Sequence, residues 1–303
     1  MRFLKAVFAL ALATCLLALG SFAQDQRTKS FGDVEWSRDG KWIAFTQMNV
    51  AKGPPMQMDS DVWVVKADGT GLKRVTGDGK NEFNPSFSHD EKTLFFNIND
   101  QVANRGDIYS IGVDGSGMKQ VTTQYPHASA PQVSPDGKWI LFNANLTADP
   151  KDHHRQIFVM KPDGSSVKQL SNDRTVGFFN PVWSPDGKRI VYYVERGDQK
   201  DQVWSMNTDG SDAKLLTANV GHNFYPSWSS DGKRILFTSQ RDGKRQLYWM
   251  NADGSSVTPL GIDAFYIKQS PDGKKIVYIS GEFPVMTLFI ADADGKNARK
   301  LVP

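Results

Sequence analysis

A motif of the form Ser-x-Asp-Gly-Lys, followed by an alternating apolar strand, recurs six times and constrains the fold more than any other feature of the sequence. Each copy is followed by a second apolar strand that ends in Asp-Gly and by a short strand such as LKRVT. One degenerate copy, SHDEK, keeps the spacing. The units span about 31–76, 77–122, 123–171, 172–217, 218–261 and 262–303. The chain therefore reads as six copies of one structural unit.

The chemistry of both landmarks is that of tight turns. An Asp side chain accepts hydrogen bonds from nearby backbone, and the Gly that follows it takes a positive φ without steric cost. Each unit then consists of four short antiparallel strands. One such sheet cannot bury both of its faces, whereas six sheets arranged radially bury them against one another. The sequence predicts an all-β fold, a six-bladed β-propeller of four-stranded antiparallel blades over residues 31–303.

The repeat resembles that of the TolB-type propeller, also called the PD40 or WD40-like repeat. Stretches such as PVWSPDGKRIVYY at 181–193 carry the resemblance. The Gly-His and Trp-Asp pattern of WD40 itself and the paired glycines of kelch are absent from the sequence. The resemblance implies a role in envelope integrity and binding to peptidoglycan-associated lipoproteins. Two features differ from relatives that share such a repeat: only the short segment 24–30 precedes the propeller, where TolB has an α/β domain, and the G-x-S-x-G elbow of prolyl-oligopeptidase-like hydrolases is missing.

Residues 1–23 have the pattern of a secretory signal peptide. Arg2 and Lys5 precede an apolar stretch, and Ser21-Phe22-Ala23 offers a small-x-small cleavage site. An uncleaved membrane anchor is the alternative, but the apolar run is shorter than the roughly 20 residues of a spanning helix. A lipid-bearing Cys15 is a further alternative, disfavoured by the Thr before it. We expect cleavage after Ala23 and a periplasmic or secreted protein with no disulfide and no membrane span.

The charge balance argues against polyanionic partners. The chain has 36 Lys and Arg against 33 Asp and Glu, and cleavage would leave 34 against 33, a net charge of +1. A nucleic-acid-binding surface needs a stronger basic excess. We therefore expect no nucleic acid, an envelope protein or peptide as partner, a glycan as a further possibility, and a monomer.

Two rims of a propeller differ in the loops they carry. The turns between the first and second and between the third and fourth strands of each blade share one rim, here called the regular rim. The loops between second and third strands and the interblade connections share the other, here called the irregular rim. Loops on a rigid scaffold are common binding sites. We predict ligand or partner contacts at Tyr125, His127, Phe179, Asn180, His222, Tyr225 and Tyr266.

Two further readings apply to this rim. Its aromatics can instead seal blade junctions, which we expect of Phe83, Phe178 and Phe224 and leave open for Tyr125, Phe179 and Tyr225. The Met- and Pro-rich loop at 47–61 suits an adaptable partner contact.

Metal binding is a weaker hypothesis. Imidazole and carboxylate ligands at His127, Asp152, His153 and His154 suit a divalent ion, although adjacent His153 and His154 point apart on an extended chain. The carboxylates of the Asp-Gly turns fit local backbone hydrogen bonds better than calcium, because no turn supplies several spaced acidic ligands. We expect no cofactor.

These observations favour a non-catalytic binding or scaffold protein of the cell envelope that contacts an envelope protein or peptide through the irregular rim. The alternative is a carbohydrate-binding protein or a metal-dependent polysaccharide-lyase-like enzyme that uses the channel mouth, because oligogalacturonate lyases have a similar repeat. The sequence offers five His and no clear acid/base pair, so it identifies no catalytic residue, and catalysis stays open.

Overall fold

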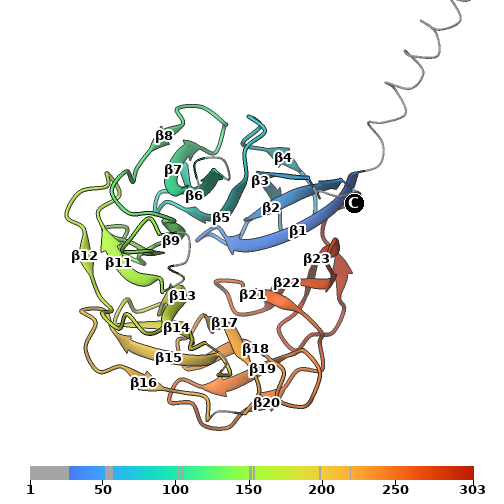
Figure 1. Cartoon of the computed structure of the whole chain (residues 1–303). Coiled ribbons are helices and arrows are strands. Elements are labelled where there is room, and N and C mark those ends of the chain that lie inside the picture. The colour runs from blue at the N-terminus through green and yellow to red at the C-terminus, as the bar shows by residue number, and fades with distance from the viewer. Residues whose placement is uncertain are drawn as a thin grey trace, which may run out of the picture.

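The computed structural model describes residues 27–51, 57–100, 103, 105–149, 152, 154–197, 199–218 and 220–303. Within these ranges the chain forms 24 strands, grouped in six four-stranded sheets. The strand order in every sheet follows the sequence, and neighbouring strands are antiparallel. Figure 1 shows the six sheets around a central axis, with the colour running once round the ring. The predicted six-bladed propeller is confirmed.

The strands fall into four positions in the blade, numbered from the axis outward. The first strands are β1 (Arg27–Trp36), β5 (Glu82–Phe87), β9 (Ser129–Val133), β13 (Gly177–Trp183), β17 (Asn223–Trp228) and β21 (Phe265–Gln269). The second strands are β2 (Trp42–Ala51), β6 (Thr93–Asp100), β10 (Ile140–Ala144), β14 (Arg189–Glu195), β18 (Arg234–Ser239) and β22 (Lys275–Glu282). The third strands are β3 (Met58–Lys66), β7 (Arg105–Gly112), β11 (Gln156–Met160), β15 (Gln202–Asn207), β19 (Gln246–Asn251) and β23 (Val285–Asp292). The fourth strands are β4 (Lys73–Arg74), β8 (Lys119–Gln120), β12 (Lys168–Gln169), β16 (Lys214–Leu215), β20 (Thr258–Pro259) and β24 (Arg299–Lys300).

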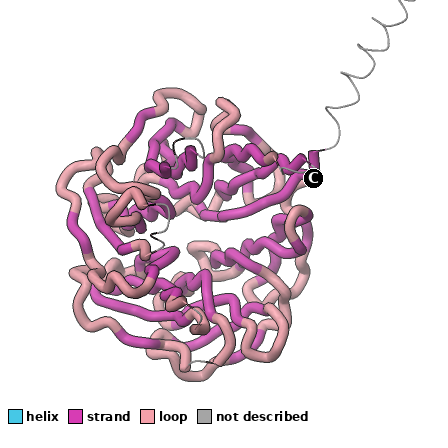
Figure 2. The backbone as a smooth tube through the Cα atoms, in the orientation of Figure 1, coloured by secondary structure: helices cyan, strands magenta, loops and turns pink. Residues whose placement is uncertain are grey.

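Two boundaries differ from the repeat pattern. The first strand of blade 1 begins at Arg27, ahead of the repeat, and pairs with β2 as far as Ala51. The segment 47–61 is largely an extension of the β2–β3 hairpin, because Gln47 pairs with Asp61 and Val50 with Met58. Residues 52–56 within that segment and the predicted signal peptide at 1–23 lie outside the described residues. Figure 2 shows that strands and loops account for the described chain, which contains no helix long and apolar enough to span a bilayer.

The hydrophobic core consists of six clusters, one at each junction between blades. At the junction of blades 3 and 4, for example, Leu141 and Ile157 pack against Ile190 and Tyr192. Alternate residues along a strand point to opposite faces of the sheet, so each blade contributes to the clusters on both sides. Packing between blades therefore carries the stability of the ring.

The ring closes by packing, without a strand shared between the chain ends. Trp36 Nε1 at the end of β1 donates a hydrogen bond to the carbonyl oxygen of Lys268 in blade 6, at 3.3 Å. The equivalent Trp183 and Trp228 donate to the first strand of the preceding blade at 3.1 and 3.3 Å. Blade 6 therefore meets blade 1 through the contact that joins other neighbouring blades.

The Asp-Gly-Lys turns have the local hydrogen bonds that the sequence predicts. In blade 3, Ser134 Oγ donates to Asp136 Oδ1 at 2.7 Å, and the backbone N–H of Lys138 donates to the same oxygen at 3.1 Å. These bonds, led by that from the Ser134 hydroxyl, hold the pKa of Asp136 below its usual value. The carboxylate of Asp136 therefore stabilises its own turn through these hydrogen bonds.

Candidate functional site

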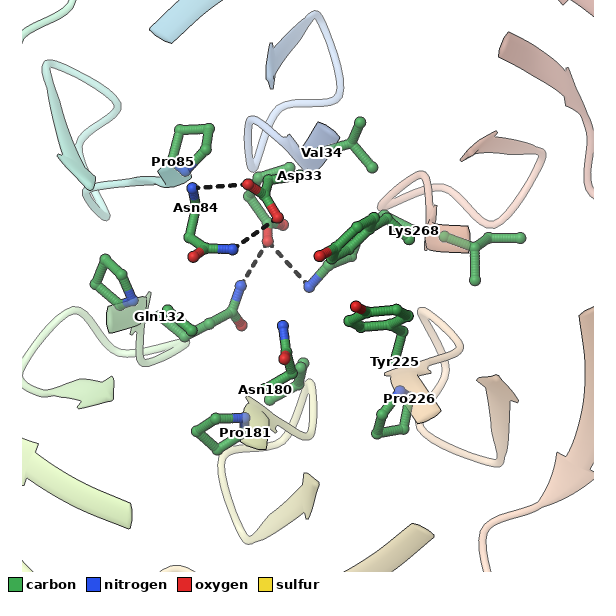
Figure 3. Close-up of a pocket in the computed structure, with 16 residues that line it drawn as sticks. Asp33, Val34, Asn84, Pro85, Gln132, Asn180, Pro181, Tyr225, Pro226 and Lys268 are labelled. Carbon is green, nitrogen blue, oxygen red and sulfur yellow. Dashed lines mark hydrogen bonds and ion pairs between the residues drawn. The ribbon is translucent and has the colours of Figure 1, made fainter. Parts of the chain in front are cut away.

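Every first strand carries a β-bulge at the same place. The residue at the bulge has a left-handed backbone, with φ between 40° and 54°, and the pairing with the second strand shifts register there. The six residues are Asp33, Asn84, Ala130, Asn180, Tyr225 and Tyr266. A bulge re-aims a side chain, and backbone of this kind is costly for residues other than glycine. Figure 3 shows Asp33, Asn84, Asn180 and Tyr225 around the axis of the propeller.

Side chains from three blades meet across the middle of the channel. Glu35 of blade 1 accepts a hydrogen bond from Gln132 Nε2 at 2.5 Å and pairs with Lys268 Nζ at 3.0 Å (Figure 3). These links tie blades 1, 3 and 6 together. They leave an axial cavity of about 60 Å³, which has room for water but not for a bulky group.

Asp33 is a buried carboxyl at the side of this axial cavity. It accepts hydrogen bonds from Asn84 Nδ2 at 2.7 Å, from the Asn84 backbone N–H at 3.2 Å and from Thr46 Oγ1 at 3.3 Å. Burial raises the pKa of Asp33 to about 6, against the opposing effect of these bonds. Asp33 thus fixes the bulge of the next blade through Asn84.

Toward the irregular rim the channel widens into a cavity of about 240 Å³, here called the mouth cavity. It is built from the first strands together with residues near the ends of β6, β10 and β14 that lead to the irregular rim. Its walls are rich in carboxamides and aromatic rings. The carboxamides are those of Asn84, Asn97, Asn99, Asn143 and Asn180, and the rings are those of Phe83, Phe179, Tyr193 and Tyr266.

One cation, Arg155, lines the mouth cavity. It precedes β11, and its Nη1 donates to Ser129 Oγ at 2.7 Å. The guanidinium lies over the ring of Phe179, 5.6 Å from the centroid, and that ring stacks on Tyr193 with centroids 5.4 Å apart. Burial lowers the pKa of Arg155, which remains a cation at neutral pH. The mouth cavity therefore combines the cation of Arg155, the hydrogen-bonded carboxyl of Asp33, an aromatic wall and carboxamides that both donate and accept hydrogen bonds.

Four of the seven predicted contact residues line the channel. Phe179, Asn180 and Tyr266 face the mouth cavity, and Asn180, Tyr225 and Tyr266 border the axial cavity. The rings of Tyr225 and Tyr266 are 4.1 Å apart at their centroids, and their hydroxyls are hydrogen-bonded. Contact with a ligand at these four residues stays a prediction.

The other three predicted residues line neither the mouth cavity nor the axial cavity. Tyr125 packs against Phe158, with ring centroids 4.7 Å apart, in the core between blades 2 and 3, which is the sealing arrangement left open above. His127 lies in the connection between these blades with a φ of 53°. His222 Nδ1 is 3.0 Å from Asp201 Oδ2. Of the rings expected to seal junctions, Phe178 and Phe224 pack in interblade clusters, whereas Phe83 lines the mouth cavity. Phe179 and Tyr225, for which both roles were left open, also pack against the cluster between blades 4 and 5.

The proposed metal ligands form no cluster in the described structure. His153 lies outside the described residues, and the described remainder of the chain contains no group of three or more His, Cys, Asp or Glu arranged to hold a metal ion. Asp152 Oδ1 is 3.4 Å from His154 Nδ1, and Asp152 Oδ2 accepts from Thr147 Oγ1 at 2.7 Å.

Comparison with known proteins agrees with the repeat and the ring. The family model described as TolB beta propeller domain, PD40, matches residues 151–303. The chain belongs to the TolB-type β-propeller family. The putative TolB from Agrobacterium tumefaciens is 26% identical, with a TM-score of 0.66, and the match covers 76% of this chain and 83% of that one. The predicted TolB resemblance is confirmed.

More distant structures share the fold of this TolB-type propeller. TolB from Acinetobacter baumannii is 22% identical with a TM-score of 0.68, and the match covers 86% of this chain but 63% of that one, less than two thirds of its length. An oligogalacturonate lyase from Vibrio parahaemolyticus is 14% identical with a TM-score of 0.60, and the match covers 91% of this chain and 78% of the lyase. No curated protein matches the sequence.

Proposed function

We propose that this TolB-type propeller is a non-catalytic binding protein of the cell envelope, periplasmic or secreted, that holds a segment of an envelope protein or a peptide at the irregular rim. The observation that carries this proposal is the mouth cavity, where side chains from several blades converge on one space of about 240 Å³. A peptide group donates one hydrogen bond and accepts another, and an Asn carboxamide can accept the first through its oxygen and donate the second through its NH₂ group. Aromatic walls supply apolar contact area beside them.

The titratable groups of the mouth cavity favour binding over catalysis. Among the described residues that line it, these are Asp33, Arg155, Tyr193 and Tyr266. The carboxylate of Asp33 already accepts hydrogen bonds from Asn84 and Thr46. Burial raises the pKa of Tyr193 and of Tyr266 well above the usual value, so both hydroxyls stay protonated at neutral pH. A nucleophile beside a base, or two carboxyls flanking one space, would favour an enzyme.

A glycan is the second candidate ligand. It is favoured by the same carboxamides, which also bond to hydroxyl groups, and by the neighbouring rings of Phe179 and Tyr193. The likeness to a lyase at 14% identity supports only the fold.

A crosslinked pull-down from native envelope extract tests the proposal. The bait is the protein expressed from the full-length sequence, compared with an Asn99→Ala/Asn180→Ala variant. Alanine is tolerated at the bulge, because Ala130 occupies the equivalent place in blade 3 with a φ of 52°. We expect a specific envelope protein whose recovery falls at least about fivefold with the variant, since buried interface contacts of this kind carry a large share of affinity.

The matched control removes two carboxamides from the regular rim, in an Asn207→Ala/Asn251→Ala variant. Both residues end third strands, far from the mouth cavity. Recovery that survives the first variant, or that falls equally with the second, contradicts the proposed site. A bait that recovers no specific protein contradicts the protein-partner proposal and favours the glycan.

A further inference from the structure

Two arginines occupy equivalent places in blades 3 and 5 but have different partners. Arg155 and Arg245 each immediately precede the third strand, β11 or β19, and each guanidinium lies over a Phe ring from the first strand of the next blade. Arg245 is held by two carboxylates, Asp263 Oδ1 at 2.6 Å from its Nε and Glu282 Oε1 at 3.2 Å from its Nη2. Arg245 therefore shows how an arginine at this position is neutralised by carboxylates of the protein itself.

Arg155 lacks such carboxylates. Across the described ranges no Asp or Glu lies within ion-pair distance of it, and its one hydrogen-bonded side chain is the neutral hydroxyl of Ser129. Its guanidinium has five N–H groups in a planar fork, so most of them remain for another acceptor. Partial removal from water has a cost that a paired carboxylate normally offsets. For Arg155 the carboxylate of Glu195 acts only from beyond ion-pair distance, and burial still lowers the pKa of the guanidinium.

Asn180 offers a second group with no partner among the described residues. The equivalent Asn84 donates its side-chain N–H to Asp33 at 2.7 Å, whereas the Asn180 carboxamide makes no hydrogen bond within the described structure. Figure 3 shows the Asn180 side chain directed into the channel. Asn180 and Arg155 both line the mouth cavity, so a ligand group held there can meet the carboxamide and the guanidinium.

We infer that the mouth cavity takes a carboxylate group of its ligand, paired with the guanidinium of Arg155 and hydrogen-bonded by the carboxamide of Asn180. The planar fork of arginine matches the two oxygens of a carboxylate, and the pair is strengthened away from water. The cavity is several times larger than a carboxylate, so it also holds the atoms next to that group. This inference rests on the proposed function for the place of binding and adds the chemistry of the ligand.

The same group occurs at the carboxyl end of a peptide and in a uronic sugar. Isothermal titration at low salt separates these sources with two matched pairs of probes: N-acetyl-Ala-Ala against its C-terminal amide, and glucuronate against glucose. We expect heat of binding from the acid of at least one pair and none from its neutral counterpart. We expect Arg155→Gln to weaken that binding at least about tenfold, because it removes a charge-assisted, bidentate interaction.

Three further variants control this result. Arg155→Lys keeps the charge without the planar fork and is expected to lie between the parent and Arg155→Gln. Asn180→Ala is expected to weaken binding less than Arg155→Gln does. Arg174→Gln removes an exposed cation from the same rim and is expected to leave binding unchanged. Circular dichroism melts show which variants remain folded, and Asn180→Ala still tests the inference if Arg155→Gln does not fold.

Each outcome decides the inference. Binding of the peptide acid or of glucuronate that Arg155→Gln abolishes supports it and identifies the source of the carboxylate. Equal binding of acid and neutral probe, binding unaffected by Arg155→Gln, or no binding of either acid overturns it. The pull-down tests the proposed function separately. A protein captured through Asn99 and Asn180 whose recovery is unchanged by Arg155→Gln would support the proposed function and overturn only the carboxylate inference.

Discussion

Replacement of Glu82 by Gln should remove most of the pH dependence of stability between about pH 6.5 and 8.5. Glu82 begins β5 and its side chain is fully buried. Burial raises the pKa of Glu82 to about 9, and the nearby carboxyls of Asp78 and Asp61 also raise it. The folded protein thus keeps a proton that the unfolded chain releases near pH 4.5. The free energy of unfolding should fall as pH rises from about 4.5 to 9, by up to about 1.4 kcal/mol per pH unit.

Urea unfolding at pH 6.5, 7.5 and 8.5 measures this effect. The parent should lose stability along the series, whereas Glu82→Gln, which keeps the shape without the charge, should change little. Asp33→Asn is the matched control, because the pKa of Asp33 rises only to about 6 and its contribution changes below that pH. Its profile should parallel that of the parent. A Glu82→Gln variant that loses stability as steeply as the parent would rule out the neutral buried carboxyl.

Alanine at Gly210 should destabilise the propeller far more than alanine at Gly187, although both glycines follow Asp in a turn. Both have a positive φ, 92° at Gly210 and 69° at Gly187, so each substitution carries backbone strain of about 1–2 kcal/mol. A Cβ at Gly210 would also lie 2.4 Å from the carbonyl oxygen of Leu170 in the preceding blade. At Gly187 the nearest atom is Pro135 Cδ at 3.9 Å. We expect a loss above about 3 kcal/mol at Gly210.

Chemical denaturation of the two variants checks this difference. Gly254→Ala provides a second case, because its Cβ would lie 2.6 Å from the carbonyl oxygen of Leu216. It should resemble Gly210→Ala. Equal losses at Gly187 and Gly210 would mean that the turn glycines act only through their φ and that the blades do not stack closely at this point.

The fold could be predicted because its determinants are local and repeated. The Ser-x-Asp-Gly-Lys turn depends on bonds between residues a few positions apart, as in Ser134 and Asp136, and six copies specify six blades. Ring closure could not be decided in this way. It depends on Trp36 meeting Lys268, two residues from the opposite ends of the chain.

One repeat position in the first strands, occupied by Asn180, Tyr225 and Tyr266, was predicted to contact a ligand. Asn180 and Tyr225 each precede a Pro in a first strand, and that position faces the channel. Asp33 and Tyr266 occupy the same position in blades without the Pro; Tyr266 was predicted because it is aromatic, whereas Asp33 was not among the predicted residues. The lack of an ion pair at Arg155 became visible only by comparison with Arg245, because the acidic partners of Arg245, Asp263 and Glu282, lie in another blade. Such differences arise from tertiary contacts.

Site-specific photocrosslinking in the native host tests most directly whether a partner binds the irregular rim. A photoreactive residue is placed at Asn99 beside the mouth cavity, at Lys200 in the loop before β15, and at Lys138 on the regular rim; all three positions are exposed. We predict crosslinks to one envelope component from Asn99, with weaker ones from Lys200 and none from Lys138. A component captured from Lys138 but not from Asn99 would contradict the account and assign recognition to the regular rim.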